Sequence, residues 1–112
     1  MKRYSSFNDF WPHYVREHAK PSTRALHFAG TSLIFPLIYL GVTSSIYWFI
    51  AIPFIAYGLA WTGHFFIEKN RPATFQYPLW SLRGDFKMFA YMLRGKMPEE
   101  VNRCRELNRE DS

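Results

Sequence analysis

Residues 25–67 read ALHFAGTSLIFPLIYLGVTSSIYWFIAIPFIAYGLAWTGHFFI, and these 43 positions contain no Asp, Glu, Lys or Arg. All 14 basic and 9 acidic residues of the chain lie in the two flanks. A helix on the surface of a soluble protein carries polar residues at every third or fourth position, and charged ones are absent here. A lipid bilayer is therefore the solvent that suits this stretch.

The uncharged run is too long for one membrane span and has the length of two. A spanning helix needs about 20 apolar residues. We expect transmembrane helices at about 25–41 and 46–67, with a short turn at 42–45. Because the turn is short, the two helices must be antiparallel neighbours. Basic residues stand in both flanks, so the positive-inside rule predicts that both termini face the cytoplasm.

The flanks also have helical patterns. Ser6 can cap a short helix over residues 7–18, and apolar residues recur at helical spacing over residues 79–93, as in an amphipathic helix at a membrane interface. We expect an all-α integral membrane protein, with a two-helix transmembrane hairpin and flanking amphipathic helices. The membrane domain comprises residues 1–97, and residues 98–112 form a polar C-terminal tail.

Charge and cysteine content exclude some classes of protein. The net charge of +5 is explained by basic residues that bracket the apolar run at a membrane surface, so we expect no nucleic-acid partner. The single cysteine excludes an internal disulfide and a cysteine-based metal site. Cys104 lies in the charged tail, where we expect it to be a bystander.

The histidines offer a candidate site. His27 lies 16.5 residues before the centre of the turn and His64 lies 20.5 residues after it, so the hairpin brings both to its cytoplasmic end. Their axial offset is about 6 Å, and neighbouring helix axes lie about 8–10 Å apart. One metal ion can bridge such a pair. Ionisable residues within membrane helices are costly and commonly functional, although a structural role in hydrogen bonding remains open.

Other residues extend this candidate site. Glu68 follows His64 at i+4, where it can ligate the same metal or hold the ring, and it can equally pair with Lys69 or Arg71. His18 precedes the break at Pro21, so the chain can fold it over the end of the hairpin. Histidine ligation without cysteine fits iron or zinc, and a haem between the two hairpin histidines is an alternative.

Three motifs together resemble those of the membrane 2-hydroxy fatty acid dioxygenase family, which includes a fungal enzyme of the endoplasmic reticulum. They are His18-x8-His27, Gly63-His64-x3-Glu68 and Asn70-Arg71-Pro72-Ala73. The resemblance covers roughly residues 7–96. It implies an iron(II)-dependent dioxygenase that shortens a 2-hydroxy fatty acid by one carbon in α-oxidation.

The resemblance also implies site residues. The implied iron ligands are His18, His27 and His64. Glu68 is the candidate catalytic residue from its i+4 spacing to His64, apart from the resemblance. A 2-hydroxy carboxylate can chelate iron and leave a place for dioxygen, while the acyl tail lies among helices or lipid. The substrate carboxylate can meet a basic side chain near the hairpin end, and the candidates are Arg71, Lys69 and Arg24.

Two functions of other kinds remain alternatives. One is a non-enzymatic scaffold or assembly protein of the membrane, whose histidines satisfy interfacial hydrogen bonds. The other is a haem-binding membrane subunit. Each alternative shares the predicted location, which is the bacterial inner membrane or the endoplasmic reticulum, with membrane lipids as neighbours.

The topology is testable with reporter fusions. Because basic residues flank the hairpin on both sides, fusions at Met1 and at Ser112 should both report the cytoplasm. A reporter inserted at Ser44, in the turn, should report the opposite side. Termini on different sides of the membrane would contradict the hairpin.

Overall fold

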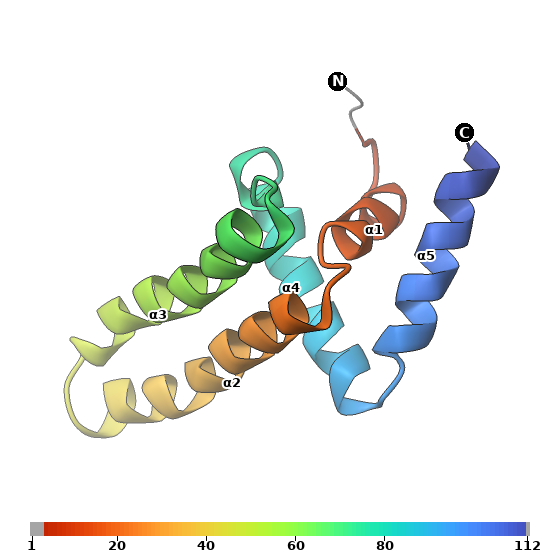
Figure 1. Ribbon diagram of the computed structural model, residues 1–112. Coiled ribbons are helices and arrows are strands. Elements are labelled where there is room, and N and C mark those ends of the chain that lie inside the picture. Colours follow the sequence, from red (N-terminus) through yellow and green to blue (C-terminus); the bar gives the residue numbers. More distant parts are fainter. Residues whose placement is uncertain (1–3, 112) are drawn as a thin grey trace.

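The computed structural model describes residues 4–111, with the side chains of residues 4–107, and this part of the chain is helical (Figure 1). No strand occurs in it, so the predicted all-α fold is confirmed. The elements in chain order are α1 (Phe7–Arg16), α2 (Pro21–Thr43), α3 (Trp48–Thr62), the π-helix η1 (Gly63–Glu68), the 3₁₀-helix η2 (Ala73–Phe75), α4 (Pro78–Leu93) and α5 (Met97–Asp111).

The predicted hairpin is formed by α2 and α3, with η1 continuing α3 to Glu68. The two helices approach closely at Gly30, where an added Cβ atom would lie 3.1 Å from the carbonyl oxygen of Ala56. Small residues permit such an approach of two backbones. The first helix begins earlier than expected because Pro21 occupies its first turn, where a proline fits the free end of a helix.

The hairpin exposes much of its apolar surface. Both arms of the hairpin, α2 and α3 with η1, are long and apolar enough to cross a bilayer. However, only 28% of the apolar stretch of the first arm and 17% of that of the second are buried. The core helix of a soluble protein would be mostly buried. A large apolar surface of this kind is typical of contact with lipid or a partner, so insertion into a membrane stays our prediction. The most exposed large apolar side chains of the hairpin are Val42, Ile46, Tyr47, Phe54 and Phe66.

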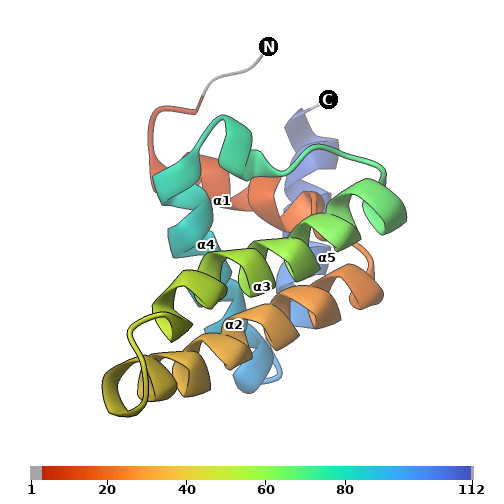
Figure 2. The ribbon, with the colours of Figure 1, turned by 90° about the vertical axis from the view of Figure 1, so that its left-hand side faces the viewer.

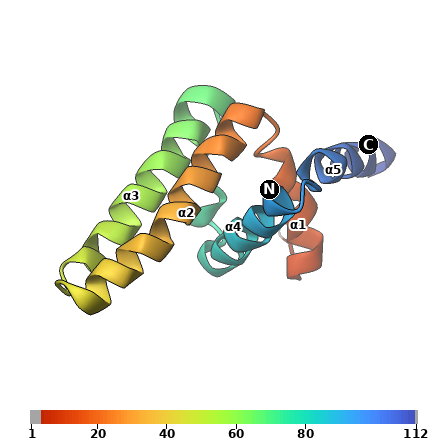
Figure 3. The same ribbon diagram turned by 90° about the horizontal axis from the view of Figure 1, so that it is seen from below.

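The other helices form a cap beside the hairpin. Helix α4 lies between the hairpin and α1, and α5 packs on the far side of α1 (Figures 2 and 3). An aromatic core holds α1, α4 and α5 together, and burial of this much apolar surface stabilises the cap. The buried residues of this core are Phe7, Phe10, Trp11, Tyr14, Val15, Met88, Met97, Val101 and Cys104.

Two predictions about the flanks are confirmed. The Ser6 hydroxyl accepts a hydrogen bond from the Asp9 N–H at 3.2 Å and so caps α1. Helix α4 is amphipathic. In its apolar row Leu79 and Leu93 are largely exposed, whereas Leu82 and Phe86 are less exposed and lie toward α2 and α3. The opposite side of α4 is buried and carries small residues and Met88. A Cβ atom added at Gly84 would lie only 3.1 Å from the Tyr14 ring, so α4 and α1 approach closely there.

The sequence from Pro98 onward predicts a last polar helix that stands in solvent as a tail. The helix is present as α5, but it packs against α1. Met97, Val101 and Cys104 recur at helical spacing and make a narrow apolar stripe within a polar sequence. That stripe turns toward α1, and the Cys104 side chain has no exposed surface. Cys104 is therefore part of the core of the cap, contrary to our expectation from the surrounding charges.

Burial gives Cys104 a testable property. It raises the pKa of the thiol from 9.0 to about 11, which lowers the thiolate fraction at pH 7 about a hundredfold. Maleimide should therefore label the native protein slowly in mild detergent and quickly after denaturation. A matched control is N102C in a C104S background, because position 102 is exposed on the same helix. Equal labelling rates at the two positions would contradict the packing of α5.

Candidate metal centre

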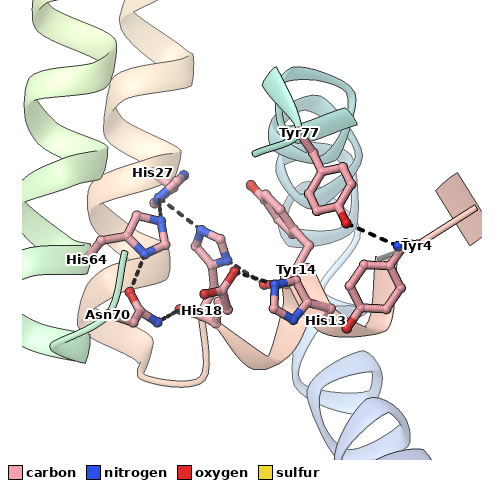
Figure 4. Close-up of polar contacts among 9 residues, drawn as sticks. Tyr4, His13, Tyr14, His18, His27, His64, Asn70 and Tyr77 are labelled. Carbon is pink, nitrogen blue, oxygen red and sulfur yellow. Dashed lines mark hydrogen bonds and ion pairs between the residues drawn. The ribbon is translucent and has the colours of Figure 1, made fainter. Parts of the chain in front are cut away.

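Three histidines converge where α1, α2 and η1 meet (Figure 4). His18 follows α1, His27 lies near the start of α2 and His64 lies in η1, and all three are buried. The Nε2 atom of His27 lies 3.1 Å from that of His18 and 3.3 Å from that of His64. The structure thus brings together the three residues that the sequence nominated as metal ligands.

The ring of His18 is oriented by the backbone of α1. Its Nδ1 lies 2.6 Å from the carbonyl oxygen of Tyr14, and a carbonyl can only accept, so Nδ1 carries the proton. Burial, and then the neighbouring rings of His27 and His64, hold the pKa of His18 well below its ordinary value. His18 is therefore neutral at pH 7, and its Nε2 directs a free lone pair into the cluster.

The ring of His64 is oriented by Asn70. The amide group of Asn70 donates to the carbonyl oxygen of Glu17 at 3.1 Å, which turns its Oδ1 toward His64 Nδ1 at 2.8 Å. His64 Nδ1 must then be the donor, and its Nε2 is again the lone pair. This contact depends on a tight reversal after η1, in which the Lys69 and Asn70 N–H groups both donate to the His64 carbonyl oxygen.

That reversal places strain beside the site. Lys69 adopts the left-handed conformation, with φ of 60°, which is uncommon for a residue other than glycine. The preceding η1 is a π-helix, and single π-turns of this kind are frequent at functional sites. Strain of this sort persists only where the surroundings enforce it, and here it turns Asn70 back onto His64.

The ring of His27 is oriented from α4. Its Nδ1 lies 3.5 Å from Oδ1 of Asp85, and the same carboxylate oxygen accepts a hydrogen bond from the Tyr14 hydroxyl. Burial, and then the Asp85 carboxylate, raise the pKa of Tyr14 well above its ordinary value, so the phenol keeps its proton and donates. Carboxylate–histidine pairs of this kind support metal ligands in many proteins.

The cluster has the dimensions of a metal site. A metal bound by imidazole lies about 2.1 Å from each nitrogen, so two such nitrogens are about 3.0 Å apart at a right angle and about 3.4 Å apart at a tetrahedral angle. The measured separations of 3.1 and 3.3 Å fall between these values. Neutral imidazole nitrogens suit iron and zinc, and three of them leave further positions for other ligands.

Glu68 lies away from the histidines. Its carboxylate accepts a hydrogen bond from the Lys20 N–H at 2.7 Å and so caps the start of α2. The Lys20 ammonium donates in turn to the Ile67 carbonyl oxygen at 3.0 Å. The Glu68 carboxylate is thus engaged with the start of α2 and is not grouped with the three histidine nitrogens. Lys20 and Glu68 together join the start of α2 to the end of η1, at the shared end of the hairpin.

The basic residues nominated for the substrate carboxylate also lie outside the cluster. The Arg24 guanidinium donates to the carbonyl oxygens of His18 and Ala19 at 2.8 and 2.7 Å, which fixes the link between α1 and α2. Lys69 and Arg71 are exposed. None of the three lines the small cavity at the histidines.

Sequence reasoning missed the residues that orient the rings. Nothing in the sequence around Tyr14 marks it as a residue of the site, and Asn70 appears there only as part of a motif. The sequence does offer an indication that Asp85 is a functional residue. It is the one acidic residue between Glu68 and Glu99, and it interrupts an amphipathic pattern. The partner of that carboxylate could not be deduced without the packing of α4 on α1.

The comparison with protein families bears on this site. The family described as 2-hydroxy-palmitic acid dioxygenase Mpo1-like matches residues 4–97. The matched segment contains the three histidines together with Tyr14, Asn70 and Asp85, which orient them. No curated protein and no solved structure matches the chain. Because the match spans most of the sequence and agrees with the resemblance seen in the histidine motifs, the chain belongs to the Mpo1-like family.

Proposed function

We propose that this protein is an iron(II)-dependent dioxygenase that shortens 2-hydroxy fatty acids by one carbon, a step of α-oxidation. The family description supports the reaction class and the kind of substrate. The observation that carries the proposal is the convergence of three Nε2 atoms, those of His18, His27 and His64, in a buried cluster. Three nitrogen ligands leave open positions of the kind used by non-haem iron oxygenases.

The side chains of the site divide the work between holding and orienting. His18, His27 and His64 hold the iron through Nε2, and bound iron(II) supplies the electron transfer to dioxygen that amino-acid side chains lack. The Tyr14 carbonyl and Asn70 fix two of the rings through Nδ1. Asp85 lies against the third ring, and the burial of the cluster keeps bulk water away.

The overall reaction balances without an external reductant. The bond between C1 and C2 of the 2-hydroxy acid breaks, C1 leaves as carbon dioxide, and C2 becomes the carboxyl carbon of the shorter acid. The electrons released by these changes reduce one molecule of dioxygen to the oxidation level of water. The products are the shortened acid, carbon dioxide and water, and carbon dioxide release should therefore equal dioxygen uptake.

The proposed location follows from the hairpin. We place α2 and α3 in a bilayer, either the bacterial inner membrane or the endoplasmic reticulum, with both ends of the chain in the cytoplasm. The histidine cluster then lies at the cytoplasmic end of the hairpin, where α2 begins and η1 ends. An amphiphilic substrate in the membrane has its polar group at that depth and its acyl chain among the helices.

The geometry disfavours the two alternatives. Axial ligands of a haem iron lie on opposite faces, about 4 Å apart, whereas the Nε2 atoms of His27 and His64 are separated by 3.3 Å. In a purely structural role the Nε2 lone pairs of His18 and His64 face one ring, that of His27, whose Nε2 can donate only one hydrogen bond. At least one buried lone pair then stays unpaired, which is costly. A scaffold protein has no reason to retain it.

Replacement of single histidines tests the proposal. H18A, H27A and H64A each remove one of three ligands, so bound iron and turnover of a 2-hydroxy fatty acid should fall together by on the order of tenfold or more. Iron is measured by elemental analysis of protein loaded anaerobically in detergent. Turnover is measured as the acid or aldehyde one carbon shorter after oxygen is admitted.

H13A is the matched control for these variants. His13 pairs with Glu17 at 2.9 Å on the outside of α1 and does not reach the cluster, so iron content should stay close to that of the unmodified chain. If the unmodified protein binds no iron, or the three cluster variants retain full iron and turnover, the dioxygenase proposal is wrong.

Asp85 should affect iron affinity without being a ligand. D85N keeps the size of the side chain but removes the charge beside His27 Nδ1, and changes at such supporting groups typically cost 10–100-fold in metal affinity. Competition with a chelator measures the affinity. D9N is the matched control, because the Asp9 carboxylate is exposed and distant from the cluster. Equal affinities of D85N and D9N would rule out this role.

A further inference from the structure

An apolar groove leads away from the histidine cluster between α2, α3 and α4. His27 and Asp85 stand at one end of the groove, and Ile34 and Ile52 stand at the other. The groove has a volume of about 190 Å³, whereas the cavity among the histidines has about 10 Å³, room for an ion or a single water. The two spaces share four lining residues, which are His27, Tyr57, Ala60 and Asp85, so they adjoin.

Two hydrogen-bond donors face the smaller cavity without a partner. Both Trp61 Nε1 and Ser81 Oγ are buried, and neither has a hydrogen bond. Ser81 is only 3% exposed. Buried donors without partners are rare in proteins, and their presence beside a cavity indicates a ligand that accepts hydrogen bonds there. A carboxylate or a hydroxyl group has the required acceptors.

The groove and the free donors together have the polarity of an amphiphile. One end offers hydrogen bonds and the metal-binding nitrogens, and the other end is lined by aliphatic side chains. A helix of a second chain would fill the groove but would leave the buried donors unpaired. The contrast between the two ends therefore favours a molecule with a polar head and a single alkyl chain.

We propose that the acyl chain of the substrate lies in this groove, with its carboxylate held by Trp61 and Ser81 and its tail directed toward the turn of the hairpin. The inference rests on the proposed function, since it names the binding mode of the same site. It replaces the basic residues expected from the sequence, because Lys69 and Arg71 are exposed and Arg24 is engaged with backbone carbonyl groups.

The length of the groove sets which part of the chain it contacts. From His27 to Ile34 α2 rises about 10 Å, and each C–C bond advances an extended chain by about 1.3 Å, so about eight carbons fit. A 2-hydroxyhexanoic acid does not reach Ile34, whereas a long-chain acid passes it. Obstruction at Ile34 should therefore affect long substrates and spare short ones.

The test uses photoaffinity labelling, which needs no turnover. The probe is a 2-hydroxy fatty acid of about 16 carbons with a diazirine near the middle of the chain. It is irradiated without oxygen in the presence of detergent-purified protein and mapped by peptide mass spectrometry. Labelling should concentrate on α2 and α3 around Ile34 and Ile52. Equal labelling of the outward-facing Phe54, which is 75% exposed, would overturn the proposal.

Two substitutions obstruct the groove from different helices. I34W fills its far end from α2, and A56L fills its middle from α3. Each should lower labelling at least about tenfold, and I34W should leave the turnover of 2-hydroxyhexanoic acid within about twofold. G58L is the matched control, because nothing lies within 4 Å of a Cβ atom added at Gly58. Unchanged labelling in both obstructed variants would overturn the proposal.

The polar end is tested with W61F and S81A. Each removes one donor and keeps most of the packing, so labelling by the free acid should fall about tenfold. Labelling by an alkane of the same length, which carries the diazirine but no group that accepts hydrogen bonds, should change little. Because labelling is read without oxygen, specific labelling in a protein without turnover would leave the groove standing and refute the dioxygenase. Turnover without labelling of the groove would overturn the groove proposal and leave the dioxygenase standing.

Discussion

The site depends on one constraint, which is that three imidazoles direct their Nε2 atoms at the same point. The Nε2 separations of 3.1 and 3.3 Å are unfavourable for bare lone pairs and suitable for nitrogens that share an ion. The Nδ1 side of each ring faces an oxygen acceptor, so the rings cannot turn away without losing that contact. A metal bound here joins α1, α2 and η1, and its binding free energy then contributes to their assembly.

Tyr14 links this constraint to the rest of the fold. Its carbonyl oxygen accepts from His18, and its hydroxyl donates to Asp85, which lies beside His27. The ring also stacks on that of His18, with centroids 4.2 Å apart, and α4 comes close to it at Gly84. The aromatic cap therefore supports the histidine cluster, and the packing of α5 on α1 belongs to that support.

The sequence predicted the parts of the site that follow from helix geometry. His27 and His64 could be placed together because the turn is short and the helical rise is constant, whereas His18 needed the family resemblance. Glu68 follows His64 at i+4 as expected, but its carboxylate accepts from the Lys20 N–H, and spacing along one helix cannot show that a neighbouring segment engages it. The contact of Tyr14 with Asp85 joins residues 71 positions apart and depends on how α4 packs, which no local pattern encodes.

A groove within a membrane has a consequence for selectivity. An acyl chain that moves from lipid into an apolar groove exchanges one apolar environment for another, so its methylenes add little to binding. Discrimination must then come from the polar end, where the donors of Trp61 and Ser81 are unpaired until an acceptor arrives. A ligand that lacks the acceptor leaves them buried and unsatisfied, which is costly. The groove then orients the chain, and the buried donors favour a ligand whose head group accepts hydrogen bonds at that end of the groove.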